Sequence, residues 1–155
     1  MSSSVVAIHI GGKESGPLTS VTSVRAFAGK GLEGDRNFFA DGADAGKALT
    51  LVEEEMVAAV GLDAGATRRQ ITVRGIGLND LVGKRFHLGE VECLAAKLCE
   101  PCAHLESMTR PGLIEDLLHR AGINADILTD GTISVGDEVR LVEEDDPAVA
   151  ERASG

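Results

Sequence analysis

Apolar positions along the chain recur mostly with the two-residue period of half-buried strands. Residues 5–10, VVAIHI, are rich in β-branched side chains, and residues 21–28, VTSVRAFA, alternate apolar and polar positions. Short runs of the same kind recur further along the chain. The pattern predicts strands at 5–10, 21–28, 48–52 and 70–75, two strands within 84–97 that meet at Leu88-Gly89, and two within 131–142 that flank a Val-Gly-Asp turn.

Two segments carry helical signals instead. The strand expected at 48–52 runs into a helix that ends at Gly61. Residues 109–123 give the clearest helix, because Thr109 can cap it and Gly122 can end it. Its apolar stripe consists of Leu113, Leu117 and Leu118. Many short strands with two helices predict a mainly β (α+β) fold, a barrel or sandwich with helices on its flanks.

Composition limits the fold to one domain with an aliphatic core. The chain has 155 residues, of which 43% are hydrophobic and only 3% aromatic, with no Trp and no Tyr. A core of this size must then be built from Val, Ile, Leu and Ala. The final stretch, 143–155, holds five acidic residues and one arginine. We expect a single domain over 1–142 and a disordered acidic tail after it.

The net charge excludes several classes of function. The formal charge of −10 repels phosphate backbones, and scarce aromatic residues argue against base stacking, so we expect no nucleic-acid partner. No run approaches the roughly 20 apolar residues of a membrane span, and the first residues do not form a signal peptide. We therefore expect a cytoplasmic protein with no membrane partner, whose three cysteines are thiols.

A glycine-rich segment, 29–47, is expected to form a long loop. Its start, GKGLEG, matches the dinucleotide-binding spacing G-x-G-x-x-G, but no apolar helical stripe follows, so the Rossmann interpretation fails. The glycines are better explained by positive φ angles and close backbone approach. Asp35 and Arg36, directly after Gly34, form either a local ion pair that holds the loop or a contact to a ligand.

Three arginines gather around one predicted strand. Arg68 and Arg69 precede it, and Arg74 lies at its end. A solvated charge cluster is the default explanation. Guanidinium groups nevertheless bind phosphate or carboxylate in a bidentate manner, and a positive patch on an acidic chain suits an anionic small molecule.

The cysteines divide into two kinds. Cys93 shares a strand face with apolar neighbours and is expected to be a buried structural thiol. Cys99 and Cys102 lie in a polar segment with His104 and allow three chemistries. A zinc site lacks a second ligand pair, so we expect no metal ligands here; a thioredoxin-like pair lacks its helix. The third is a single reactive thiolate activated by His104 and nearby arginines.

Four segments carry a family pattern in their order and spacing: GLEGDR (31–36), TRRQITVRGIGLNDLVGKRFHLGEVE (67–92), EPCAHLE (100–106) and GTISVGDEV (131–139). Together they resemble the MOSC domain, the C-terminal domain of molybdenum cofactor sulfurases that also occurs as small standalone bacterial proteins. The resemblance runs from about Val5 to Val142 and implies a β-rich, barrel-like fold. It also implies a role around the molybdenum cofactor, either binding it or carrying sulfur to metal–sulfur centres.

The resemblance assigns roles to particular residues. The family's proposed sulfur carrier corresponds to Cys102, and thiol-exchange chemistry would place a persulfide there. His104 would orient or deprotonate this thiol, and Cys99 could resolve the persulfide as a disulfide. The family's Gly-Asp-Arg loop and arginine-containing strand correspond to Gly34, Asp35 and Arg36, and to Arg68, Arg69 and Arg74. Arg68 and Arg69 would hold the phosphate of the cofactor, molybdopterin.

Departures from the family pattern keep other functions open. Cys99 stands where many relatives have Arg, and Arg69-Gln70 stands where many standalone relatives read Glu-Asn. The pyridoxal phosphate desulfurase of the sulfurases is a separate domain, so the implied partners are a cysteine desulfurase or a molybdoenzyme. One alternative is a non-catalytic binding module for a phosphorylated or oxyanion ligand. Another is a molybdenum enzyme that reduces N-hydroxylated compounds, which in larger relatives requires an added N-terminal domain. If the protein is an enzyme, the resemblance implies a sulfur-transferase-like activity in the sulfuration of the molybdenum cofactor.

Overall fold

The computed structural model describes residues 3–11, 18–35, 38–39, 41–42, 48–59, 61, 69–98 and 122–142. In these ranges the chain forms β1 (Ser4–Ile10), β2 (Thr19–Val21), β3 (Ser23–Phe27), β4 (Gly31–Leu32), β5 (Leu49–Glu53), α1 (Glu54–Ala59), β6 (Ile71–Arg74), the 3-10 helix η1 (Leu78–Leu81), β7 (Arg85–Leu88), β8 (Val91–Leu98), β9 (Ile123–Ile127), β10 (Gly131–Ser134) and β11 (Val139–Leu141).

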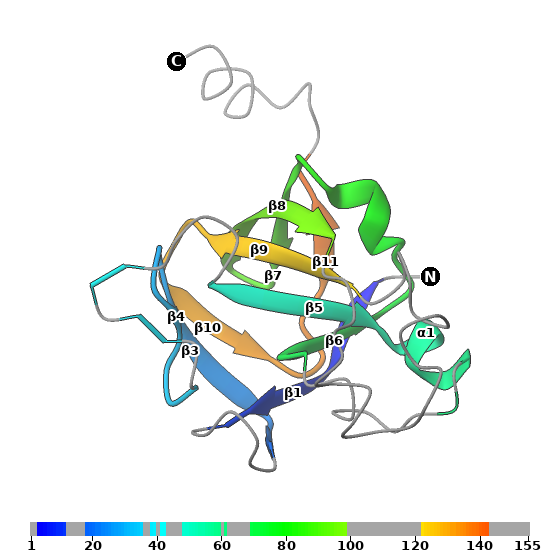
Figure 1. Cartoon of the computed structure of the whole chain (residues 1–155), viewed down its shortest axis with the longest axis horizontal. Coiled ribbons are helices and arrows are strands. Elements are labelled where there is room, and N and C mark those ends of the chain that lie inside the picture. The colour runs from blue at the N-terminus through cyan, green and yellow to red at the C-terminus, as the bar shows by residue number, and fades with distance from the viewer. Residues whose placement is uncertain are drawn as a thin grey trace.

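Eight strands form one curved sheet in the order β11-β7-β8-β9-β5-β6-β1-β2, and a smaller sheet has the order β10-β3-β4. The main sheet curls into an open half-barrel (Figure 1). Within the described ranges, all neighbouring strands of this sheet are antiparallel except β5 and β6. The curl brings β1 against the segment before β11, where Ser4 and Glu138 form a bridge and Val5 N donates to Asp137 O at 2.9 Å. The expectation of a mainly β, barrel-like fold is confirmed.

The core fills the inside of this curl. Its buried side chains come from both sheets and are almost all aliphatic, with Phe86 as the aromatic member of the cluster. Cys93, expected to be a buried structural thiol, lies in this cluster and is fully shielded from solvent. Removing apolar surface from water is the main driving force for such a fold, so the aliphatic composition explains how a chain with few aromatic residues stabilises it.

Most predicted elements agree with the structure. The strands expected at 5–10, 70–75 and within 84–97 correspond to β1, β6 and the β7–β8 hairpin. The strand that leads into a helix before Gly61 corresponds to β5 and α1. The two strands within 131–142 are β10 and β11. The segment expected at 21–28 contains β3, and its first residue, Val21, is the end of the short β2. The expected tail, 143–155, and most of the expected helix, 109–121, lie outside the described residues.

The sequence interpretation missed β9, which lies in the middle of the main sheet between β8 and β5. Its sequence, INADI, alternates strictly, with Ile123, Ala125 and Ile127 buried in the core. The expected helix ran as far as residue 123 and masked this pattern. Gly122, expected to end that helix, instead leads into β9 with φ of +101°, and a Cβ there would overlap the carbonyl of Leu51. A glycine is needed because β9 and β5 approach closely at this point.

A β-bulge in β1 decides which face its side chains occupy. The register with β6 shifts between Val5 and Ala7, so Val5 and Ile8 both enter the core although they are three residues apart. Residues after the bulge alternate again, and His9 therefore lies on the sheet face opposite to Ile8. The bulge thus places a histidine on the outer face of the half-barrel.

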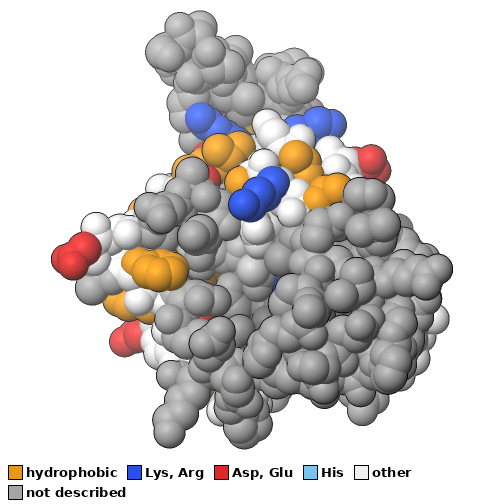
Figure 2. Space-filling model, viewed as in Figure 1, with side chains coloured by type: hydrophobic (Ala, Val, Ile, Leu, Met, Phe, Trp, Pro, Cys, Tyr) orange, Lys and Arg blue, Asp and Glu red, His pale blue; other side chains and the backbone are white. Residues whose placement is uncertain are grey.

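The described surface mixes charges with small apolar groups. Figure 2 shows hydrophobic side chains in separate groups, with basic side chains among them and acidic ones toward the edges of the view. The large hydrophobic residues that are exposed, Phe39, Leu128, Val135 and Leu141, are each at most 43% accessible. No helix within the described ranges is long and apolar enough to cross a lipid bilayer.

Candidate functional site

A buried hydrogen-bond network joins four separate parts of the chain at one end of β6. Its members are Gly11, Asp35, Thr50 and Gln70, and we call it the Asp35–Gln70 network. The Asp35 carboxylate accepts from the backbone N–H of Gly11 at 3.0 Å and from the Gln70 side-chain amide at 2.6 Å. Asp35 is 6% exposed and Gln70 is 1% exposed. Hydrogen bonds at such buried positions are costly to lose, so this network fixes the local geometry.

Gln70 is held from its other side by Thr50 on β5. The Gln70 carbonyl oxygen Oε1 accepts from the backbone N–H of Thr50 at 2.8 Å, and the backbone N–H of Gln70 donates to Thr50 Oγ1 at 3.0 Å. The side-chain amide therefore uses both its oxygen and its nitrogen, which defines its orientation. The network ties β5 and the start of β6 to the glycine loop and to the end of β1.

The glycine loop reaches this network because its backbone adopts unusual angles. Gly29, Gly31 and Gly34 have φ of +69°, +131° and +83°, as the sequence interpretation expected when it rejected a dinucleotide site. Residues other than glycine rarely adopt these backbone angles. The turn at Gly34 directs the next residue, Asp35, inward to Gly11 and Gln70. The Asp35 carboxylate is therefore engaged with the protein's own donors.

Among the expected site residues, the structure brings Gly34, Asp35 and Arg69 together. Asp35 bonds to Gln70, and Arg69 is the residue directly before Gln70 at the start of β6. Arg74 lies at the opposite end of the same strand. The glycine loop thus lies beside the chain at Arg69, while Arg74 is separated from them by the length of β6.

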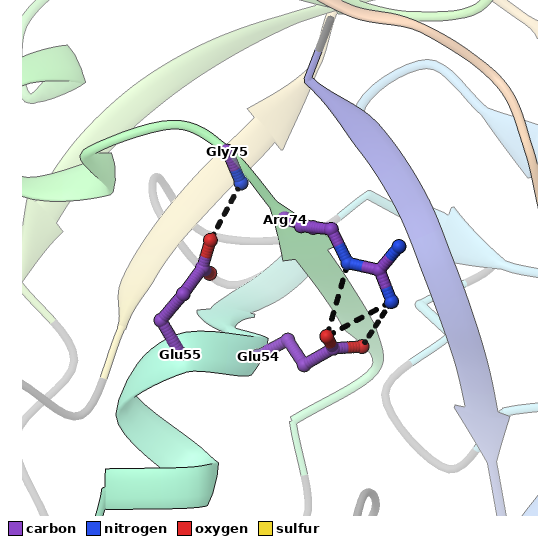
Figure 3. A network of polar contacts seen from close by, with 4 residues as sticks. All are labelled: Glu54, Glu55, Arg74 and Gly75. Atoms are coloured by element: carbon purple, nitrogen blue, oxygen red, sulfur yellow. Dashed lines mark hydrogen bonds and ion pairs between the residues drawn. The ribbon is translucent and has the colours of Figure 1, made fainter. Parts of the chain in front are cut away.

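Arg74 makes a bidentate ion pair with the first turn of α1. Its Nε donates to Glu54 Oε1 at 3.0 Å and its Nη2 to Glu54 Oε2 at 3.1 Å, and the neighbouring Gly75 N–H donates to Glu55 at 2.9 Å (Figure 3). The Arg74 and Glu54 side chains are 57% and 40% exposed. Arg74 thus couples the end of β6 to α1, and its role as a ligand contact stays a prediction.

The remaining expected site residues lie outside the described part of the chain. These are Arg36, Arg68, Cys99, Cys102 and His104. Within the described ranges, no group of three or more His, Cys, Asp or Glu side chains is arranged to hold a metal ion. Cys93 is the one cysteine that the structure describes. Burial raises the pKa of its thiol far above the usual range, so it remains protonated and unreactive at neutral pH.

The sequence interpretation did not identify Gln70, His9 and Thr72 as site residues. Gln70 was noted only as a departure from relatives, although a glutamine directly before a buried strand is a usable signal. His9 is 9% exposed and Thr72 is 1% exposed, and both lie on neighbouring strands next to Gln70. Burial lowers the pKa of His9, so its imidazole is neutral at pH 7. No sequence pattern distinguishes these two from ordinary strand residues.

The curled sheet with its polar end defines a small β domain of a recognisable class. The sequence matches the family model of the MOSC domain over residues 45–140, more than half of the chain. The chain therefore belongs to the MOSC domain family. No protein with a curated description matches its sequence.

Solved structures show the same fold. The YuaD protein from Bacillus subtilis superposes with a TM-score of 0.74 at 18% identity, covering 91% of this chain and 96% of YuaD. YiiM from Geobacillus stearothermophilus has a TM-score of 0.72 at 20% identity, covering 95% of this chain and 78% of that one. YiiM from Escherichia coli has a TM-score of 0.68 at 18% identity, with coverages of 90% and 69%. At these identities the likeness establishes the fold and not the chemistry.

Proposed function

We propose that this MOSC domain holds the phosphate of the molybdenum cofactor at the start of β6 and carries sulfur, as a persulfide on Cys102, for delivery to metal–sulfur centres. The observation that carries the proposal is the 2.6 Å hydrogen bond between Gln70 and Asp35. It fixes the glycine loop against the residue that follows Arg69. Family membership supplies the rest of the support.

The residues at this end of β6 fit an anionic cofactor. Arg69 supplies a guanidinium group, which binds phosphate through paired N–H donors. Asp35, a buried carboxylate in the same network, accepts hydrogen bonds from Gly11 and Gln70. Its charge is therefore compensated by the protein's own donors, which reduces its repulsion of a phosphate. When bound, the cofactor supplies molybdenum–sulfur chemistry; Arg69, with Arg68, binds and orients it.

The sulfur transfer requires only thiol exchange. The Cys102 thiolate attacks the outer sulfur of a persulfide on a cysteine desulfurase, so a new S–S bond forms as the old one breaks. The desulfurase cysteine leaves as its thiolate, and no net oxidation occurs. His104 takes the proton of the Cys102 thiol before the attack. If Cys99 then attacks Cys102, hydrosulfide leaves and a disulfide forms, which a dithiol reductant such as a thioredoxin returns to two thiols.

Mass spectrometry tests the carrier role. The intact protein is incubated with a cysteine desulfurase and cysteine, and the mass of each cysteine-containing peptide is measured. We expect one added sulfur atom on the peptide with Cys102, and none in Cys102→Ser. Cys93→Ser is the matched control and should load normally, because burial keeps Cys93 protonated. Loading that is absent from the wild type, or unchanged in Cys102→Ser, contradicts the proposal.

A second candidate function is supported by the same end of β6. The Asp35–Gln70 network and Arg69 can position an oxyanion or a phosphorylated molecule without any thiol. A non-catalytic binding module of this kind should bind inorganic phosphate in titration calorimetry, lose that binding in Arg69→Ala and keep it in Cys102→Ser. Phosphate binding without persulfide loading would favour this module over the sulfur carrier.

A further inference from the structure

Basic side chains gather where the described part of the chain ends. β11 pairs with β7, and this pairing continues past Leu141, because the backbone N–H of Val142 donates to the carbonyl oxygen of Arg85 at 3.1 Å. In an antiparallel register the next position along the chain faces Lys84, the residue before Arg85. Figure 2 shows basic side chains in this upper part of the view, where β11 ends in Figure 1. The chain therefore leaves the described sheet at a basic surface.

Two lysines form the part of this surface that has no compensating charge. Lys84 lies directly before β7, and its carbonyl oxygen accepts from the backbone N–H of Ala95 on β8 at 3.0 Å. Lys97 follows Ala95 by two residues, and both lysines are exposed. Within the described ranges, neither ammonium group has an ion pair. These two cations stand out on a chain whose formal charge is −10.

The neighbouring arginines differ from the lysines because carboxylates already lie near them. The Arg85 guanidinium lies 3.8 Å from the carboxylate of Glu92, whose side chain is 8% exposed. The Arg140 guanidinium lies 3.9 Å from the carboxylate of Glu138. Each carboxylate offsets part of the positive charge beside it. An acidic group at the end of β11 is therefore attracted chiefly by the two lysines.

The chain itself supplies an acidic segment at this point. Residues 143–146 read Glu-Glu-Asp-Asp and directly follow Val142. Four residues of extended chain span about 13 Å, and the path from β11 across β7 to β8 is two strand spacings, about 10 Å. The segment can therefore reach Lys97 as well as Lys84. Because it is tethered next to these lysines, its effective concentration there exceeds that of a free acidic partner.

We propose that residues 143–146 continue β11 beyond Val142 and bind Lys84 and Lys97 through their carboxylates. The first acidic residue of the segment faces Lys84 across the continued register, and the later ones cross the start of β7 toward Lys97. The chain thereby covers its own basic surface, and any other acidic partner must displace this segment to bind there. The contact uses neither Cys102 nor Arg69, so its outcome is independent of the proposed function.

Carbodiimide cross-linking of the whole chain tests this contact. The reagent joins a lysine amine to a carboxylate that touches it, and mass spectrometry of the digest locates each link. We expect links from Lys84 and Lys97 to residues 143–146, most of which should be lost in about 1 M salt, where charges are screened beyond about 3 Å. Lys30, an exposed lysine between β3 and β4, is the matched control and should form no such link. An equal mixture of unlabelled and heavy-isotope-labelled protein shows whether each link lies within one copy.

Competition by a free hexaglutamate peptide, measured by NMR titration, separates this contact from general charge repulsion. The variant with an uncharged segment carries Glu143→Gln, Glu144→Gln, Asp145→Asn and Asp146→Asn. It should bind the peptide about threefold more tightly than the wild type, because freed lysines can form exposed ion pairs of about that strength. Adding Lys97→Gln should remove this gain. Glu151→Gln, outside the acidic run, is the matched control and should behave as the wild type. Circular dichroism shows whether each variant is folded.

Several results would contradict the proposal. If the links join two copies, a second copy of the chain is the occupant and the contact within one chain is wrong. If Lys30 is linked as often as Lys84 and Lys97, the links report random collisions. If no link to residues 143–146 forms, or if Lys97→Gln leaves the peptide affinity of the uncharged variant unchanged, the acidic segment does not occupy this surface.

Discussion

A carboxylate accepts hydrogen bonds at each end of β6, but it is exposed at one end and buried at the other. At its end, Arg74 pairs with Glu54 through three short contacts, and both side chains are largely exposed. At its start, Gln70 pairs with Asp35 and Thr50, and Gln70 and Asp35 are almost fully buried. By charge alone, the Arg74–Glu54 pair should be the stronger interaction, because it joins two full charges.

Burial reverses that ranking. An exposed ion pair exchanges one well-solvated state for another, so its net contribution is at most about 1 kcal/mol. Water cannot reach a buried carboxylate and amide, so removing one partner leaves the other desolvated and without a hydrogen bond. The start of β6 is therefore where a change should disturb the fold, and its end is where a change should be tolerated.

The largest effect should come from Asp35→Ala. The variant leaves the Gly11 N–H and the Gln70 amide buried without their acceptor, and we expect a loss of about 3 kcal/mol in the free energy of unfolding. Urea denaturation at pH 7 measures this loss. Asp130→Ala is a matched control, since Asp130 also accepts from a backbone N–H, that of Ala28, but at an exposed position. If Asp130→Ala lowers the free energy of unfolding as much as Asp35→Ala does, burial does not explain the effect of Asp35.

An intermediate effect concerns the pH dependence of stability. Burial lowers the pKa of His9 below its usual 6.5, so below that pH the unfolded chain binds a proton that the folded chain does not. The contribution of neutral His9 is present above pH 6.5 and is lost as the pH falls toward its folded pKa, by at most about 1.4 kcal/mol per pH unit. Urea denaturation of the wild type and His9→Gln at pH 7 and 5 should show a smaller acid loss in the variant. Equal losses would mean that His9 titrates alike in both states.

The smallest effect should come from Arg74→Gln. We expect a loss below about 1 kcal/mol in the free energy of unfolding, because the pair with Glu54 is exposed. The loss should shrink further in about 1 M salt, which screens charges beyond about 3 Å. Thermal unfolding at low and high salt measures both. A salt-independent loss of several kcal/mol would show that the ion pair is more important to the coupling of β6 with α1 than its exposure indicates.

The alternation of apolar and polar residues predicted the strands whose pairing is mostly with neighbours or whose sequence alternates clearly. β1, β6 and the β7–β8 hairpin follow from two-residue periodicity and turn residues, and buried Cys93 follows from its apolar neighbours. β9 was missed because its five residues directly follow a helical pattern, and only its pairing with β5 and β8 identifies it as a central strand.

The candidate site was less accessible to sequence reasoning. The family resemblance assigned Gly34, Asp35 and Arg69 to one cofactor site, which stays a prediction, and it gave no reason for Asp35 to turn inward. That depends on Gln70 and on the N–H of Gly11, which are 35 and 24 residues away in sequence. His9 became an outer-face residue only through the bulge between Val5 and Ala7, a one-residue shift that no alternation pattern reveals.

The central place of β9 has a consequence for how the chain acquires its fold. Without β9 the main sheet is divided into two pieces, β11-β7-β8 and β5-β6-β1-β2, which within the described ranges share no strand ladder and are linked by the isolated bridge between Ser4 and Glu138 and the backbone hydrogen bonds beside it. During synthesis, one edge of β5 therefore stays unpaired until β9 is made, more than 70 residues later, where Leu51 pairs with Ile123. Closing such distant pairings is slow, and unpaired edges invite association with other chains. Folding of this domain should thus be limited by its last third, and chaperone binding should be most needed just before residues 123–127 emerge from the ribosome.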